Sequence, residues 1–210
     1  MCIVVKKMQD TNVTYGQIVT LMHAAFKERV LQGLKYTCSY MDVNTYIENS
    51  RGGVILVAMN ADELCGTAML HINTDKGGAK YGYIENLAIS PKVKRMGVGS
   101  LLLKEVLKIV AENKGDYLLS DTAVDADSAV KFHKKNGFKI VGLHSYQSTN
   151  YYSYLFRLQL QPSRVWSNGF CVKFIFLLSY IKTKMEFKPN GKRKLFYNYF
   201  CRVRTMLCKK

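Results

Sequence analysis

The chain has 210 residues, of which 48% are hydrophobic, 22% are charged and only 3 are proline. This balance is typical of a folded protein and excludes a disordered one. The length allows one well-buried domain with an appendage and excludes two domains of full size.

The net charge of +16 is concentrated toward the end of the chain. Residues 161–210 carry 12 Lys and Arg residues against a single acid, Glu186. A basic chain can indicate nucleic acid as a partner, but here the excess charge belongs mainly to this segment. We therefore divide the chain into a domain at 1–160 and a basic extension at 161–210.

Hydrophobic spacing in the first ninety residues predicts two helices followed by three strands. A strand over 2–8 precedes an amphipathic helix over 15–30, and Asp42 is the expected N-cap of a second helix over 43–49. The three strands that follow begin with a hairpin and span 53–59, 64–72 and 80–89.

The second half alternates helices and strands. An apolar helix follows Gly97 and Gly99, and a shorter helix over 127–136 is closed by Gly137. The remaining strands are predicted over 117–122, 138–143 and 151–158. The order β-α-α-β-β-β-α-β-α-β-β predicts an α/β fold with a mixed, mostly antiparallel sheet and helices on both faces.

The cysteines indicate a reducing compartment. All six are scattered, with no Cys-x-x-Cys pair and no nearby histidine, so we expect free thiols and no metal site. The apolar run within residues 1–7 is too short for the core of a signal peptide. From the sequence we expect a cytoplasmic protein.

The most informative stretch is the turn between the strand at 80–89 and the next helix. Gly97 and Gly99 let the backbone turn tightly with no side chain in the way, so N–H groups at the helix start can converge on an anion. A lone Gly-x-Gly pair can form a mere turn, but its position between strand and helix favours a phosphate site. The expected binding residues are Lys94, Arg95, Met96, Gly97, Val98, Gly99 and Ser100.

Two motifs resemble those of the GNAT superfamily of acyl-coenzyme A-dependent N-acetyltransferases. The family's coenzyme motif, Arg/Gln-x-x-Gly-x-Gly/Ala, is matched by residues 94–99, with lysine at the first position. Its Phe-Tyr-x-x-x-Gly-Phe motif is matched by residues 132–138, with His133 in place of the tyrosine. The element order also fits, so the resemblance covers residues 1–160.

The resemblance implies a GNAT-like fold with acetyl-CoA as co-substrate. In such a fold the strand over 80–89 parts from the strand over 117–122, and the pantetheine arm lies in the gap like an added strand. Leu87 and Ile89 would offer it backbone hydrogen bonds, with Ala88 between them.

The resemblance also implies three catalytic candidates. Glu85 matches a carboxylate that takes a proton from the attacking ammonium, although it could instead be an edge-strand residue in a salt bridge. His133 stands where the family's tyrosine protonates the departing thiolate, and the alternative is a solvated surface residue. Tyr152 is a second expected proton donor, unless the tyrosines of the last strand only pack the sheet.

The expected reaction is direct acetyl transfer from acetyl-CoA to a primary amine in a ternary complex. We expect the loop over 31–41 to cover the acceptor site, and an amino sugar or another small-molecule amine as the acceptor. Two alternatives stay open: a peptide or protein N-acetyltransferase, and a non-catalytic CoA-binding or membrane-associated module.

The extension contains an apolar run over 170–181 that is too short to span a bilayer as a helix. With its flanking lysines, residues 170–210 are expected to lie on an anionic membrane surface, which would place the protein peripherally at the inner face of the membrane. Packing on the domain, or on a second subunit of a homodimer, is the alternative. Nucleic acid is not favoured, because no binding module accompanies these basic and aromatic residues.

Overall fold

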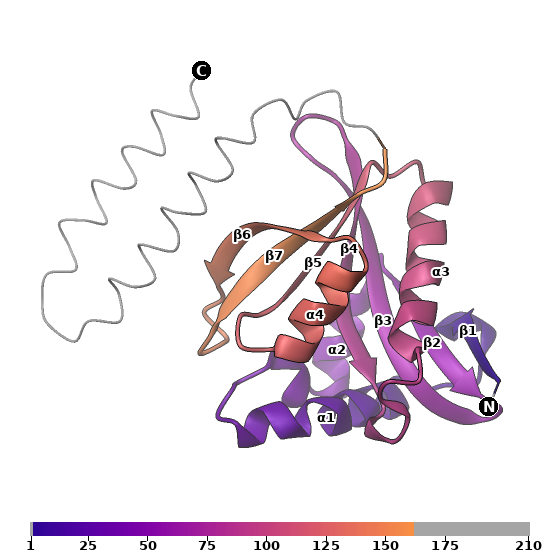
Figure 1. Ribbon diagram of the computed structural model, residues 1–210. Coiled ribbons are helices and arrows are strands. Elements are labelled where there is room, and N and C mark those ends of the chain that lie inside the picture. Colours follow the sequence, from indigo (N-terminus) through magenta and orange to yellow (C-terminus); the bar gives the residue numbers. More distant parts are fainter. Residues whose placement is uncertain (1, 162–210) are drawn as a thin grey trace, which may run out of the picture. The chain divides into compact units, whose positions relative to one another are not determined.

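The computed structural model describes residues 2–161, which form one seven-stranded sheet and four α-helices (Figure 1). The strands are β1 (Ile3–Lys7), β2 (Val54–Asn60), β3 (Glu63–Thr74), β4 (Lys80–Ile89), β5 (Tyr117–Ala123), β6 (Lys139–Ser145) and β7 (Tyr152–Gln159). The helices are α1 (Tyr15–Leu31), α2 (Val43–Ser50), α3 (Val98–Glu112) and α4 (Asp127–Lys135). The predicted element order is confirmed. What was predicted for residues 162–210 lies outside the described residues.

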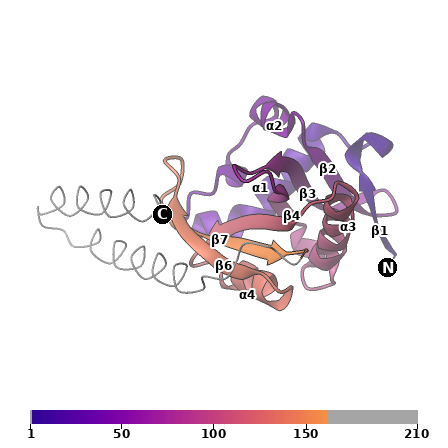
Figure 2. The same cartoon turned by 90° about the horizontal axis from the view of Figure 1, so that it is seen from above.

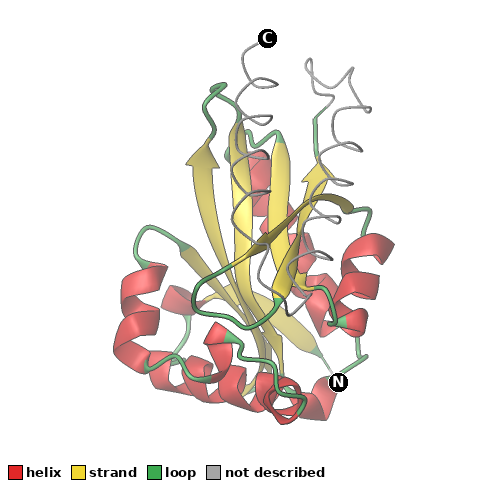
Figure 3. Ribbon diagram, turned by 90° about the vertical axis from the view of Figure 1, so that its left-hand side faces the viewer, coloured by secondary structure: helices red, strands yellow, loops and turns green. Residues whose placement is uncertain are grey.

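The sheet has helices on both faces, as predicted. α1 and α2 cover one face and α3 and α4 the other (Figure 2), and Figure 3 shows the strands between the helices in yellow. Consecutive side chains of β3 enter the two cores: Met69 packs with Met22 of α1, and Leu70 packs with Leu102 of α3. This alternation is the expected result of a strand buried on both faces.

Local sequence fixes where α1 and α2 begin. The backbone N–H of Gln17 donates to Thr14 Oγ1 at 3.3 Å, and that of Thr14 donates to Gln17 Oε1 at 2.8 Å, which is a capping box. The backbone N–H of Thr45 donates to Asp42 Oδ1 at 2.9 Å, so the predicted N-cap of α2 is confirmed. The cap at Asp42 fixes the end of the loop over 32–42.

The sheet is antiparallel except between β4 and β5. Its order is β1-β2-β3-β4-β5-β7-β6, so β7 returns to lie between β5 and β6. β4 and β5 are parallel, and α3 connects them. Among residues 2–161, no helix combines the length and apolar character that crossing a membrane requires.

The two parallel strands pair for only part of their length. Their register runs from Tyr81 opposite Tyr117 to Ile84 opposite Ser120, although β4 continues to Ile89. Beyond Ile84 the register of β3 with β4 shifts, and Asn86 adopts a left-handed backbone with φ 51°. This bulge bends β4 away from β5 and opens a fork at the end of the parallel pair.

Candidate active site

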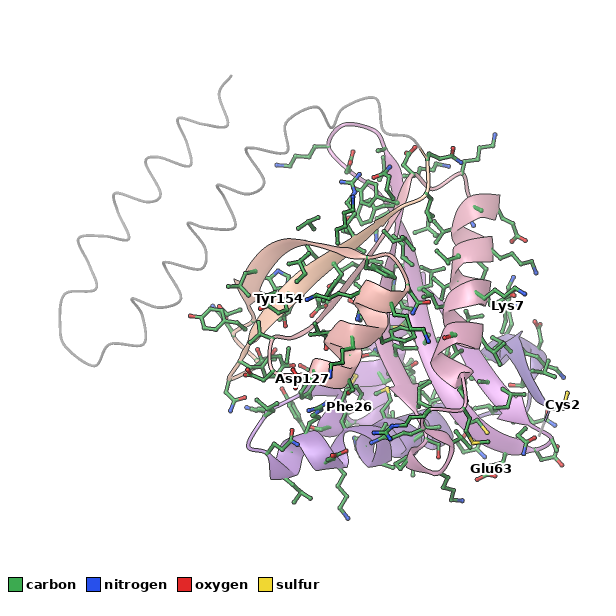
Figure 4. The ribbon with its side chains drawn as sticks, viewed as in Figure 1. Cys2, Lys7, Phe26, Glu63, Asp127 and Tyr154 are labelled. Carbon is green, nitrogen blue, oxygen red and sulfur yellow. The ribbon has the colours of Figure 1, made fainter. Side chains whose placement is uncertain are left out.

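A cavity of about 1000 Å³ fills the fork between β4 and β5. Its walls come from α1, the loop after α1, the starts of α3 and α4, and the loop between β6 and β7. Figure 4 labels Phe26 of α1 and Asp127 at the start of α4, and both line this cavity. A volume of this size suits an extended cofactor arm together with an acceptor.

One end of the cavity is the turn before α3. Gly97 is the N-cap of α3 with φ 83°, and Arg95 is also left-handed with φ 67°. Among the described residues, no acceptor is found for the backbone N–H groups of Arg95, Gly97, Val98 and Gly99, whereas those of Met96 and Ser100 donate to carbonyls within the turn. Four free amides at a helix start form a concave anion site.

Most of the predicted cradle lines the cavity. Lys94, Arg95 and residues 97–100 do so, whereas Met96 is not part of the wall and its side chain is exposed. Arg29 of α1 and Lys135 of α4 add two further cations to the wall. Four cations beside free amides suit a ligand with several phosphate charges.

Lys94 is held by a carboxylate of α1. Its Nζ donates to Glu28 Oε2 at 3.1 Å, and this contact lowers the pKa of Glu28. Glu28 also lines the cavity, so its charge competes with phosphate for the ammonium of Lys94.

We expect Glu28→Gln to bind acetyl-CoA about twofold to fivefold more tightly in calorimetric titrations at low salt, because the variant breaks only an exposed ion pair and frees the ammonium of Lys94 for phosphate. Glu63→Gln is the matched control. It breaks a similar exposed pair, Lys92 Nζ to Glu63 Oε1 at 2.9 Å, outside the wall of this cavity. Weaker binding by Glu28→Gln would show that Glu28 positions Lys94 rather than competing for it.

The unpaired part of β4 forms the long wall of the cavity. Leu87, Ala88 and Ile89 all line it, and none of them pairs with β5. The edge of β4 that faces the fork is therefore available for hydrogen bonds to an extended ligand, which is the geometry of strand addition.

Two carboxylates lie where the fork opens, Glu85 on β4 and Asp121 on β5. Glu85 is half-buried, and desolvation raises its pKa, with a smaller contribution in the same direction from Asp121. His71 Nε2 lies 3.9 Å from Glu85 Oε2, and its charge when protonated opposes this shift. Glu85 thus lines the cavity as a carboxylate whose pKa is shifted toward neutrality, as a general base requires.

Asp121 is part of a network that the sequence did not suggest. Tyr83 Oη donates to Asp121 Oδ1 at 2.7 Å, and the hydroxyl oxygens of Tyr83 and Tyr146 lie 3.3 Å apart. Burial and the neighbouring carboxylate raise the pKa of Tyr83, so its hydroxyl keeps its proton. All three residues line the cavity, on three different strands or their ends. Only the topology brings them together.

His133 is buried, at 5% exposure, which excludes the solvated surface position considered above. Its Nδ1 lies 2.7 Å from the carbonyl of Ala129, which can only accept, so Nδ1 carries the proton and Nε2 accepts from Ser120 Oγ at 2.9 Å. Its ring stacks on Phe156, and burial lowers its pKa. As a neutral ring, His133 directs no N–H into the cavity; a role as proton donor would need a second proton that burial disfavours.

Tyr152 does not line the cavity, which corrects the expectation of a proton donor there. The tyrosine that reaches the cavity is its neighbour Tyr151, whose ring packs against that of Tyr36 at a tilt of 33°, with centroids 4.7 Å apart. Adjacent residues of an extended chain point in opposite directions, so a one-residue error in position exchanges the two tyrosines.

Two loops meet over the far end of the cavity. The side chain of Asn150 accepts from the backbone N–H of Lys35 at 2.8 Å and donates to the carbonyl of Gly33 at 2.8 Å. Tyr40 Oη donates to the carbonyl of Ser148 at 3.1 Å. The loop over 32–42 includes most of the 31–41 segment that the sequence predicts to cover the acceptor, and it is fastened to the loop over 146–151.

A forked sheet with an amide cradle and an exposed strand edge is the architecture of an acyl-coenzyme A-dependent transferase. Among residues 2–161, no three His, Cys, Asp or Glu side chains are grouped so that they could hold a metal ion. The sequence matches the Acetyltransferase (GNAT) family over residues 20–138, more than half of the chain. The chain belongs to this family, and it is an acyltransferase.

Relatives of known sequence match a shorter region. N-alpha-acetyltransferase 30 of Xenopus laevis and that of Homo sapiens are each 29% identical over 82 residues, or 39% of this chain. The match covers 30% of the frog protein and 23% of the human one, so this chain corresponds to less than a third of either relative.

Solved structures share the fold over most of the chain. The NatC complex bound to Gag peptide and CoA has a chain with a TM-score of 0.58 and 16% identity, covering 77% of this chain and 100% of that one. A GNAT acetyltransferase from Elizabethkingia anophelis with acetyl-CoA bound has a TM-score of 0.52 and 18% identity, covering 75% of this chain and 98% of that one. Acetyl-CoA is therefore a co-substrate that this fold accommodates.

Proposed function

We propose that this enzyme transfers the acetyl group of acetyl-CoA to the terminal α-amino group of a peptide or protein. The observation that carries the proposal is the fastened pair of loops over the acceptor end. Because Asn150 joins the loop over 146–151 to Gly33 and Lys35, an amine reaches Glu85 most easily at the end of a chain. The relatives named N-alpha-acetyltransferase 30 and the peptide in the NatC structure support this choice over the amino sugar expected first.

The charges of the cavity suit both substrates. Lys94, Arg95 and free amides line the cavity at the turn before α3, whereas Glu85 and Asp121 line it where β4 and β5 part. A carboxylate pair attracts an ammonium group, and the cationic end attracts phosphates. The site therefore holds the donor and acceptor in a fixed order along the cavity.

The reaction needs a neutral amine next to a thioester carbonyl. Acetyl-CoA supplies the thioester when it is bound. Glu85 accepts the proton of the ammonium, directly or through a water molecule, and its raised pKa favours this transfer near neutral pH. Tyr83 stays protonated on Asp121 and keeps that carboxylate oriented. Tyr146 lies within reach of the same network and is placed to contact the acceptor.

The test compares three acceptors in the presence of acetyl-CoA. They are a pool of lysine-free peptides that differ in their first residue, an N-terminally blocked peptide with an internal lysine, and an amino sugar. We expect thiol release and an acetyl mass increase with the first acceptor, and much less with the others. Equal acetylation of the internal lysine, or acetylation of the amino sugar alone, would contradict the proposal.

A further inference from the structure

The loop over 32–42, at the acceptor end of the cavity, is joined to β4 by one thiol. Cys38 lies in the short 3₁₀ turn Thr37–Ser39, and its Sγ donates to Asn86 Oδ1 at 2.9 Å. Within residues 2–161, this is the one side-chain hydrogen bond between the loop over 32–42 and β4. Both partners line the cavity, as does Glu85, the residue before Asn86 in β4.

Asn86 is also the residue that bends β4. It has a left-handed backbone at φ 51°, in the bulge that follows the last pair with β5. Asparagine tolerates this conformation better than most residues, but it is not required by the backbone alone, because glycine would adopt it without strain. A side chain that both occupies the bulge and accepts a hydrogen bond from 48 residues away links two parts of the site.

Cys38 is suited to a structural bond and not to nucleophilic chemistry. Burial raises the pKa of its thiol to about 12, so it keeps its proton and acts as a donor across the physiological range. The acceptor loop is also fastened to the loop over 146–151 through Asn150. The acceptor loop therefore has one attachment to β4 and a separate one to the loop over 146–151.

We propose that Cys38 and Asn86 are positioning residues that set the acceptor loop at a fixed distance from the bulge, and so align the amine with the thioester. The inference deepens the proposed function and depends on acetyl transfer to an amine at this site. It predicts that losing the bond affects the acceptor and leaves the donor end at Gly97 unchanged, since the side chain of Cys38 bonds to Asn86 of β4 and not to the turn before α3.

We expect Cys38→Ala to raise the KM of the acceptor about threefold to tenfold, which corresponds to about 0.7–1.4 kcal/mol, within the range of one neutral hydrogen bond. The Kd of acetyl-CoA, measured by calorimetry, should change less than about twofold. Cys38→Ser keeps a donor and should recover most of the loss. Cys2→Ala, at an exposed thiol, is the control for removing a cysteine.

Asn86→Gly gives an independent route, because it keeps the bulge and removes only the side chain. If the bond is the cause, the Cys38→Ala and Asn86→Gly effects should not add in the double variant. Additive effects, or a normal acceptor KM in Cys38→Ala, would overturn the inference. A wild-type enzyme inactive on every amine would instead contradict the proposed function, so the two failures differ.

Discussion

Glu85→Gln is expected to lower kcat/KM for the acceptor about 10²- to 10⁴-fold, the range typical of losing a general base. The amide has nearly the same shape as the carboxylate but cannot accept the proton of the ammonium. Because Glu85 lies where the fork opens and is not part of the cradle at residues 94–100, the Kd of acetyl-CoA should stay within about twofold of the wild-type value. Thiol release at saturating donor measures the first quantity and calorimetry the second.

The pH dependence separates Glu85 from its neighbour. Activity should fall as pH drops through the raised pKa of Glu85, where the base becomes protonated. Asp121→Asn removes a negative charge that raises this pKa, so the acidic limb should move to lower pH while remaining present. In Glu85→Gln that limb should disappear. Full activity of Glu85→Gln at neutral pH would remove Glu85 from the mechanism and make Asp121 the next carboxylate to consider.

Gly97→Ala is expected to weaken acetyl-CoA binding about fivefold to thirtyfold. The site at φ 83° would be strained by about 1–2 kcal/mol in any L-residue, although nothing lies within 4 Å of an added Cβ. The turn can relieve this strain only by leaving the left-handed conformation, which disperses the free amides. Acetyl-CoA can then bind only when the turn returns to the left-handed conformation, so the strain energy is subtracted from the binding free energy. Calorimetric titration measures the loss.

Gly78→Ala is the matched control for this substitution. Gly78 has φ 82° in the turn between β3 and β4, also with nothing within 4 Å of an added Cβ, and it does not line the cavity. Its backbone strain and its loss of thermal stability should resemble those of Gly97→Ala. An equal loss of donor affinity in both variants would mean that the effect comes from general destabilisation and not from the cradle.

The fold could be predicted from the sequence because its signals are local. The apolar runs of β2 and β3, the cap at Asp42 and the glycine turn before α3 each depend on a few adjacent residues. The cradle was predicted for the same reason. Pairing that brings distant segments together, such as β7 between β5 and β6, has no local signature and appears only in the structure.

The acceptor end of the site was harder to predict, because its residues are distant in the sequence and meet only in the folded chain. Asp121 and Tyr83 lie on neighbouring strands 38 residues apart, and Asn86 meets Cys38 across 48 residues. Neither pair forms a motif in the sequence. His133 was found through its motif, but its burial against Phe156 and its bond to Ser120 depend on packing that the motif does not describe.

The most direct test of the account is amide hydrogen exchange of the full chain with and without coenzyme A. The account predicts slower exchange on binding at Leu87–Ile89, along the unpaired edge of β4, and at the free amides of Arg95, Gly97, Val98 and Gly99. The amides of α2 should exchange as before. Unchanged exchange along both β4 and the turn at a saturating concentration of coenzyme A would contradict the central claim that the donor lies in this fork.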